Sequence, residues 1–284
     1  MNTVTATFRL PSIYLAYQAF KYCIYCLLLV NLVLFFQENT AALAHTFKGG
    51  VPLANLIEAY SDTIDTAAWV LLLLLFELET YVLNDKWLTR RVTTALFLVR
   101  GISYLFISYS LYGYLSRYFS VLNASPFSIA DACTLVGTSF TQISTLNEYI
   151  PITLDDCAAL NAAPLVQLDG TQIIGTQTDY GIIKNLAFID VVNAATWLLI
   201  VVILEIDVYL QTRHAKAGLL IKLTNAIKVL CYVALLGCAI YWGMDGDFLD
   251  FWDAFLWLIA FVFIEMNLFE WQKEIDANRS KAAA

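Results

Sequence analysis

Six long apolar segments constrain the fold of this chain more than any other feature of its sequence. At about 1.5 Å per residue, each is long enough to cross the hydrocarbon core of about 30 Å as a helix. Their apolar residues are continuous and do not alternate, which favours helices over a β-barrel. The sequence therefore predicts an all-α polytopic membrane protein with six transmembrane helices. The segments are 18–37, 66–83, 93–116, 191–210, 218–243 and 252–270.

The composition agrees with a chain that is solvated by lipid. Hydrophobic residues make up 60% and charged residues only 14%, against about 25% charged in soluble domains. The net charge of −8 argues against binding nucleic acid. The two histidines, His45 and His214, fall in predicted loops, so we expect no haem, other cofactor or metal site. Hydrolase and phosphate-loop motifs are missing from the sequence, so we expect no enzyme.

The first apolar segment has an alternative interpretation. Residues 23–36 resemble the apolar part of a signal peptide, with 42–44 (Ala-Leu-Ala) as a cleavage site. That site lies far from the apolar run, which favours a retained helix.

The charges of the predicted loops indicate how the helices are oriented. Basic residues lie in the turns 84–91 and 211–217 and in the C-terminal tail, whereas the other connections are acidic. Because Lys and Arg in short loops stay on the cytoplasmic side, we expect both termini in the cytoplasm.

One connection, 118–190, is long enough to be a small loop-rich extracytoplasmic insertion. It contains Cys133 and Cys157, which we expect to form a disulfide on an oxidising face; the alternative is two free buried thiols. The segment 165–174 reads as a β-hairpin that turns at Asp169 and Gly170.

Three of the predicted helices share a spaced pattern of polar and aromatic residues. An Asp is followed after three residues by Asp or Asn, after four more by Trp, and after another eight by Glu. In the first two copies a Tyr follows the Glu by four residues. The copies are Asp62-Asp65-Trp69-Glu77-Tyr81, Asp190-Asn193-Trp197-Glu205-Tyr209 and Asp250-Asp253-Trp257-Glu265.

The other three helices share a basic residue four positions before a Tyr. The distance from Glu77 to Arg100 and from Glu205 to Lys228 is the same, at 23 residues. We therefore predict three related helical hairpins, 1–92, 93–217 and 218–284. The basic copies are Lys21-Tyr25, Arg100-Tyr104 and Lys228-Tyr232.

The position of each motif residue suggests a role. Asp62, Asp190 and Asp250 lie where outer helix ends are predicted, so we expect them to cap the helices; the alternative is an external ring that attracts cations. The deeper residues form one predicted polar layer in the inner half of the bilayer, in which acids pair with bases. Pairing is expected because an isolated charge there costs at least ~2.5–3.5 kcal/mol. The layer comprises Lys21, Tyr25, Glu77, Tyr81, Arg100, Tyr104, Glu205, Tyr209, Lys228, Tyr232 and Glu265.

Two functions follow from this layer. Intramembrane ionisable residues favour transport of protons or small ions through it. Alternatively, the pairs are structural, and the protein is a non-catalytic accessory or assembly subunit of a larger membrane complex. Partners are then the lipid bilayer and other membrane subunits or a second copy.

Overall fold

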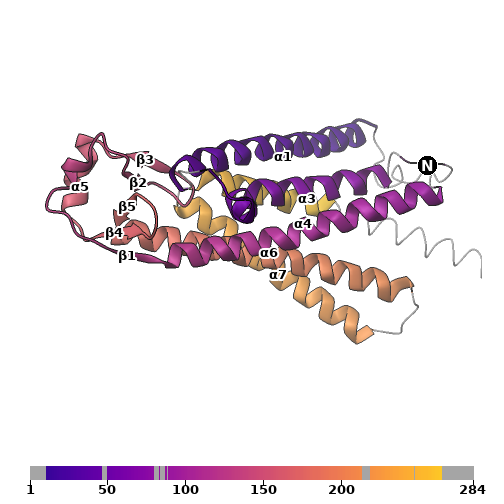
Figure 1. Cartoon of the computed structure of the whole chain (residues 1–284). Coiled ribbons are helices and arrows are strands. Elements are labelled where there is room, and N and C mark those ends of the chain that lie inside the picture. The colour runs from indigo at the N-terminus through magenta and orange to yellow at the C-terminus, as the bar shows by residue number, and fades with distance from the viewer. Residues whose placement is uncertain are drawn as a thin grey trace, which may run out of the picture.

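The computed structural model describes residues 11–46, 50–79, 83, 87, 89–212, 218–245 and 247–263. The protein is mostly helical, and its helices lie beside one another with a small sheet domain at one end (Figure 1). Four of the helices are long and apolar enough to cross a membrane. These candidate spans are Leu15–Thr46, Arg90–Leu122, Gln177–Ile206 and Lys222–Asp245.

The helices of the bundle pack in the order α1, α3, α4, α6 and α7. A short helix, α2, precedes α3, and a last helix follows α7, of which residues 248–263 are described. The second and sixth predicted spans correspond to α3 and to this last helix. The bounds are α1 Pro11–Thr46, α2 Leu56–Ala59, α3 Ser61–Glu77, α4 Arg90–Leu122, α6 Gln177–Thr212 and α7 Gly218–Asp245.

Several helices extend beyond the apolar segments that predicted them. The last turn of α1 includes His45, which was expected in a loop. At the start of α6, the side chains of Thr176 and Asp179 each accept a hydrogen bond from the other's backbone N–H. This capping box explains why the helix begins well before its apolar part. The insertion between α4 and α6 is consequently 123–176 and not 118–190.

The insertion is more regular than the loop-rich segment that the sequence predicts. It contains a five-stranded sheet in the order β1-β4-β5-β2-β3. Its strands have only three or four residues, too few for a clear alternating pattern. The elements are β1 Ala124–Phe127, η4 Ala132–Leu135, β2 Thr141–Ile143, β3 Tyr149–Pro151, α5 Leu154–Asn161, β4 Leu165–Leu168 and β5 Ile173–Thr176.

Two local predictions for the insertion are confirmed. Strands β4 and β5 form an antiparallel hairpin, and the Thr171 N–H donates to the Leu168 carbonyl across a turn centred on Asp169 and Gly170. Gly170 has φ of 76°, a conformation that glycine adopts without strain. Cys133 and Cys157 form a disulfide that joins η4 to α5.

The sheet domain and the bundle share a hydrophobic core. Leu146 and Ile173 of the domain pack with Trp242 of α7 and Ala254 of the last helix. The helices also bury an apolar core of their own, and away from both cores large apolar side chains such as Phe97 and Leu230 are exposed along the helices. This distribution is expected where helices face lipid instead of water.

Candidate functional site

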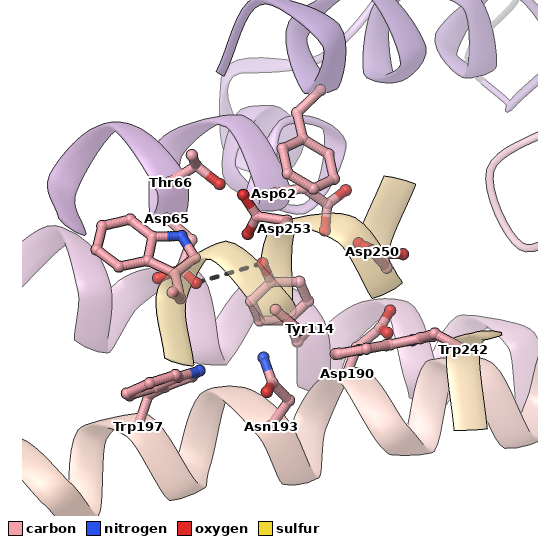
Figure 2. Close-up of a pocket in the computed structure, with 13 residues that line it drawn as sticks. Asp62, Asp65, Thr66, Tyr114, Asp190, Asn193, Trp197, Trp242, Asp250 and Asp253 are labelled. Atoms are coloured by element: carbon pink, nitrogen blue, oxygen red, sulfur yellow. Dashed lines mark hydrogen bonds between the residues drawn. The ribbon is translucent and has the colours of Figure 1, made fainter. Parts of the chain in front are cut away.

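Motif residues from α3, α6 and the last helix converge on one cavity within the bundle (Figure 2). The cavity has a volume of about 40 Å³, which is enough for about three or four water molecules at roughly 10–15 Å³ each. Five aspartates line it. The lining residues are Phe35, Asp62, Asp65, Thr66, Tyr114, Asp190, Asn193, Trp197, Trp242, Asp250, Asp253, Ala254 and Trp257.

Arg117 of α4 is the cation that contacts two of these carboxylates. Its guanidinium donates to Asp62 at 2.9 Å and 3.3 Å and lies 3.9 Å from Asp190. It also donates to the Ser61 hydroxyl. Its side chain is only 13% exposed, so the charge–charge contacts are little screened by water. Asn39 of α1 adds a further hydrogen bond to Asp62, at 2.8 Å.

Two of the other carboxylates receive hydrogen bonds from neutral donors. The Tyr114 hydroxyl donates to Asp65 at 3.5 Å, and the Asn31 side-chain amide donates to Asp253 at 2.8 Å. Both donors are buried. These acids are therefore hydrogen-bonded without a cation in contact among the described residues.

The last cavity carboxylate, Asp250, lies against Asp247 at the start of the last helix. The Asp250 N–H donates to the Asp247 side chain at 3.4 Å. Burial, opposed in part by the interaction with Asp250, raises the pKa of Asp247 above its ordinary value.

Two polar atoms of the cavity wall lack a hydrogen bond within the described part of the chain. They are the Asn193 side-chain carbonyl and the Trp242 indole N–H. Trp242 is only 3% exposed, and its indole faces the Asp190 carboxylate without reaching normal hydrogen-bond geometry. Buried polar groups of this kind are usually satisfied by water.

The structure corrects the predicted helix caps. Asp190 caps no helix, because α6 begins at Gln177. Asp247, and not Asp250, accepts the capping hydrogen bond at the start of the last helix. Asp62 does lie in the first turn of α3, but its carboxylate oxygens bind Arg117 and Asn39 instead of backbone N–H groups.

The three motif tryptophans meet in an apolar layer. Trp69 lies 6.0 Å from Trp197 and 6.2 Å from Trp257, measured between ring centroids. Phe261 packs on Trp197 at 4.4 Å. Along α3 and α6 the tryptophan follows the cavity aspartate and precedes the deeper glutamate. This tryptophan layer therefore separates the cavity from the inner charges.

The inner charges begin with a buried pair between α1 and α3. Lys21 is fully buried and donates to Glu77 at 2.6 Å. Tyr22 and Tyr25 donate to the same carboxylate at 3.0 Å and 3.4 Å. The sequence left open which acid Lys21 meets, and the structure places that acid in its own predicted hairpin.

The other predicted members of the polar layer are arranged differently. Arg100 pairs with Glu79, which is not one of the predicted layer residues, and not with Glu77. Tyr104 donates to Glu205 at 3.0 Å on an exposed part of the surface. The layer thus consists of separate contacts of unequal burial. Lys228 and Tyr232 lie half-buried on α7. The side chain of Tyr209 and all of Tyr81 and Glu265 lie outside the described residues.

Arg117, Tyr114, Asn31 and Trp242 were not predicted as site residues. A signal existed for Arg117, because it is a basic residue on the predicted acidic side of the membrane. Neutral residues in an apolar helix carry no comparable signal.

Comparison with protein-family models, curated proteins and solved structures found no match for this chain.

Proposed function

We propose that this protein spans the membrane six times and moves protons or small cations across it by way of the acidic cavity. The observation that carries the proposal is the convergence of five aspartates on one small cavity, with one guanidinium in contact among the described residues. This cavity lies nearer the sheet domain than the inner polar layer that was predicted from the sequence.

The charge balance of the cavity supports a role in binding protons or cations. Five ionised carboxylates and one guanidinium would leave an excess of four negative charges inside the bundle. Unpaired charges in such surroundings cost several kcal/mol each, so carboxylates there take up protons or cations. A group of acids that binds and releases positive charge within a membrane is what a transporter requires.

The packing of the motif residues supports the three-hairpin interpretation and the six spans. Helix α1 packs on α3, and α4 packs on α6, as two successive hairpins would. The three motif tryptophans come from three different helices and meet at one level. The tryptophan positions of the three copies thus lie in the same layer.

A transport path through these elements has a definite order. It runs from the acidic cavity through the tryptophan layer toward Glu205 and Glu77. Because Trp69, Trp197 and Trp257 pack together, the layer is closed to ions here. Transport therefore requires that these side chains separate, as in an occluded carrier.

Reconstitution in liposomes tests the proposal. A pH-sensitive dye in the lumen should report proton flux for the wild type under an imposed gradient, with Na⁺ or K⁺ gradients measured in parallel. Asp65→Asn and Asp253→Asn should reduce the flux at least tenfold, because each removes an acid from the cavity wall. Asp169→Asn, in an exposed turn of the sheet domain, is the matched control and should leave it unchanged. Absence of any flux in the wild type would reject transport.

A second function, as an accessory or assembly subunit, is favoured by one contact. The Lys21–Glu77 pair is buried and receives two additional tyrosine hydrogen bonds, which is the arrangement of a structural pair. Purification from native membranes in mild detergent separates the two functions. A stable complex with other membrane proteins, combined with no flux, would support this second role.

A further inference from the structure

We propose that the species held in the acidic cavity is the proton, and that Arg117 divides the carboxylates into an ionised pair and a proton-holding group. The ionised pair is Asp62 and Asp190, and the proton-holding group is Asp65, Asp253 and the Asp247–Asp250 pair. This inference rests on the proposed function, and it names the species that moves.

The ionised pair follows from contact with a permanent cation. An arginine side chain keeps its charge in proteins, and a guanidinium stabilises a carboxylate that it contacts. Asp62 receives two hydrogen bonds from Arg117, and Asp190 lies 3.9 Å from it. Among the described residues, no other cation contacts the remaining acids of the cavity.

Asp65 and Asp253 have partners that do not require an ionised carboxylate. A phenol hydroxyl and a side-chain amide are neutral donors, and both can equally donate to the carbonyl oxygen of a protonated acid. Tyr114 and Asn31 are 8% and 1% exposed. Bulk water is therefore kept from these contacts, and a neutral acid is the form of lower free energy there.

The Asp247–Asp250 contact brings two carboxyl groups together at the start of the last helix. Asp247 is buried and accepts a hydrogen bond from the Asp250 N–H, and two carboxyl groups at such a shared site hold one proton between them.

The unsatisfied atoms of the wall favour water and protons over a metal ion. The Trp242 indole N–H is only a donor, whereas the Asn193 side-chain carbonyl is an acceptor, and both lack partners among the described residues. Water satisfies both, while a metal cation cannot accept from the indole. No group of three or more Asp, Glu, His or Cys in the described part of the chain has the spacing of a metal site.

Charged and titratable groups from every packed element surround these acids. They are Glu38 of α1, Asp62 and Asp65 of α3, Tyr114 and Arg117 of α4, Glu148 and Tyr149 of the sheet domain, Asp190 of α6, Cys238 of α7, and Asp247, Asp250 and Asp253 at and within the last helix. Acids predominate over bases in this set, so it opposes further ionisation.

Infrared difference spectroscopy of the purified full-length protein in detergent tests the inference without any transport measurement. We expect the carbonyl band of protonated carboxylic acids in the wild type at neutral pH, with the small shift that deuterium exchange causes. Asp65→Asn and Asp253→Asn should each lose part of the band. Asp62→Asn should lose none, because its carboxylate is ionised.

Further measurements keep the test independent of a misfolded variant. Adding Na⁺, K⁺ or Ca²⁺ at constant pH should leave the wild-type band in place. Arg117→Gln should increase it, because Asp62 and Asp190 would then need protons, and Arg117→Lys should restore the wild-type intensity. Absence of the band in the wild type, or its loss on adding a metal cation, would overturn the proton assignment even if the liposomes show ion flux. A band without flux would instead reject the proposed transport and leave the assignment intact.

Discussion

Lys21 and Glu77 form a buried ion pair inside the bundle. The lysine is fully buried, and the nitrogen–oxygen distance is 2.6 Å. Such a pair contributes little net free energy, but removing one partner leaves an uncompensated buried charge. The effect of a substitution therefore depends on whether it leaves the other charge behind.

The first prediction concerns this pair. Glu77→Gln should lower the free energy of unfolding by about 3–5 kcal/mol, measured by denaturant titration in detergent micelles. The double variant Lys21→Met with Glu77→Leu should recover most of the loss. Glu79→Gln is the matched control, because its pair with Arg100 is about one-third exposed and should change stability by less than about 1 kcal/mol. Equal losses for Glu77→Gln and Glu79→Gln would contradict the burial argument.

The second prediction concerns Asp247, whose pKa burial raises above its ordinary value of 3.8. The folded protein then binds this proton more tightly than the unfolded chain does. Its contribution to stability is complete below the ordinary pKa and is lost as pH rises through the raised pKa. We expect the midpoint of thermal unfolding to fall as pH rises above about 4.

Asp247→Asn should make that decline shallower, because the amide stays neutral and still caps the helix. Asp131→Asn is the control. A side-chain hydrogen bond from Asn161, together with the Cys133 N–H, lowers the pKa of Asp131. Its contribution therefore has the opposite sign and is lost as pH falls. An unchanged slope in Asp247→Asn would contradict the assignment.

At the scale of elements, the contact between α3 and α4 positions Arg117 beside Asp62. Gly113 allows this close approach, because a Cβ there would lie 2.9 Å from the Ile57 carbonyl oxygen and 3.1 Å from the Ser61 Cβ. Arg117 lies one helical turn further along the same face of α4. Gly113 and Arg117 therefore both lie in the interface between α3 and α4.

The third prediction follows from this contact. Gly113→Ala should lower the free energy of unfolding by about 1–3 kcal/mol, because the backbone of α2 and α3 must move to make room. Gly101→Ala, on the same helix, has nothing within 4 Å of the added Cβ and should be neutral or stabilising by up to about 1 kcal/mol. Thermal unfolding of the two variants side by side measures the difference. A loss for both would point to a general effect of α4 and not to this contact.

At the scale of the whole molecule, the chain forms an apolar helical bundle with a sheet domain at one end, and the disulfide lies within that domain. Disulfides persist where the surroundings are oxidising, and the turn around 84–91 is basic. Both observations favour a sheet domain outside the cytoplasm and that turn inside it.

The fourth prediction is this orientation. A membrane-impermeant maleimide applied to intact cells should label a cysteine placed at Asp169, in the sheet domain. It should label a cysteine at Trp87, which is 68% exposed, only after the membrane is permeabilised. The parent protein, with its own cysteines, provides the background. Labelling of Trp87→Cys in intact cells would reverse the orientation.

The sequence by itself determined the features that depend on local composition. The long apolar helices, the disulfide between Cys133 and Cys157, and the hairpin around Gly170 could all be predicted from runs, spacing and turn chemistry. Burial in lipid depends on the summed hydrophobicity of a continuous segment, and a turn depends on a few adjacent residues. Helices that face lipid and tight turns can therefore both be predicted from the order of residues along the chain.

Only the tertiary structure decided which polar residues meet. Lys21 contacts Glu77, but Arg100 contacts Glu79 and Asp190 lies far inside a helix. Such contacts depend on helix rotation, relative depth and actual helix ends, which the packing of many apolar side chains sets jointly. The aspartates could be found from their repeated spacing, whereas the cavity between them and the place of Arg117 within it required the packed bundle.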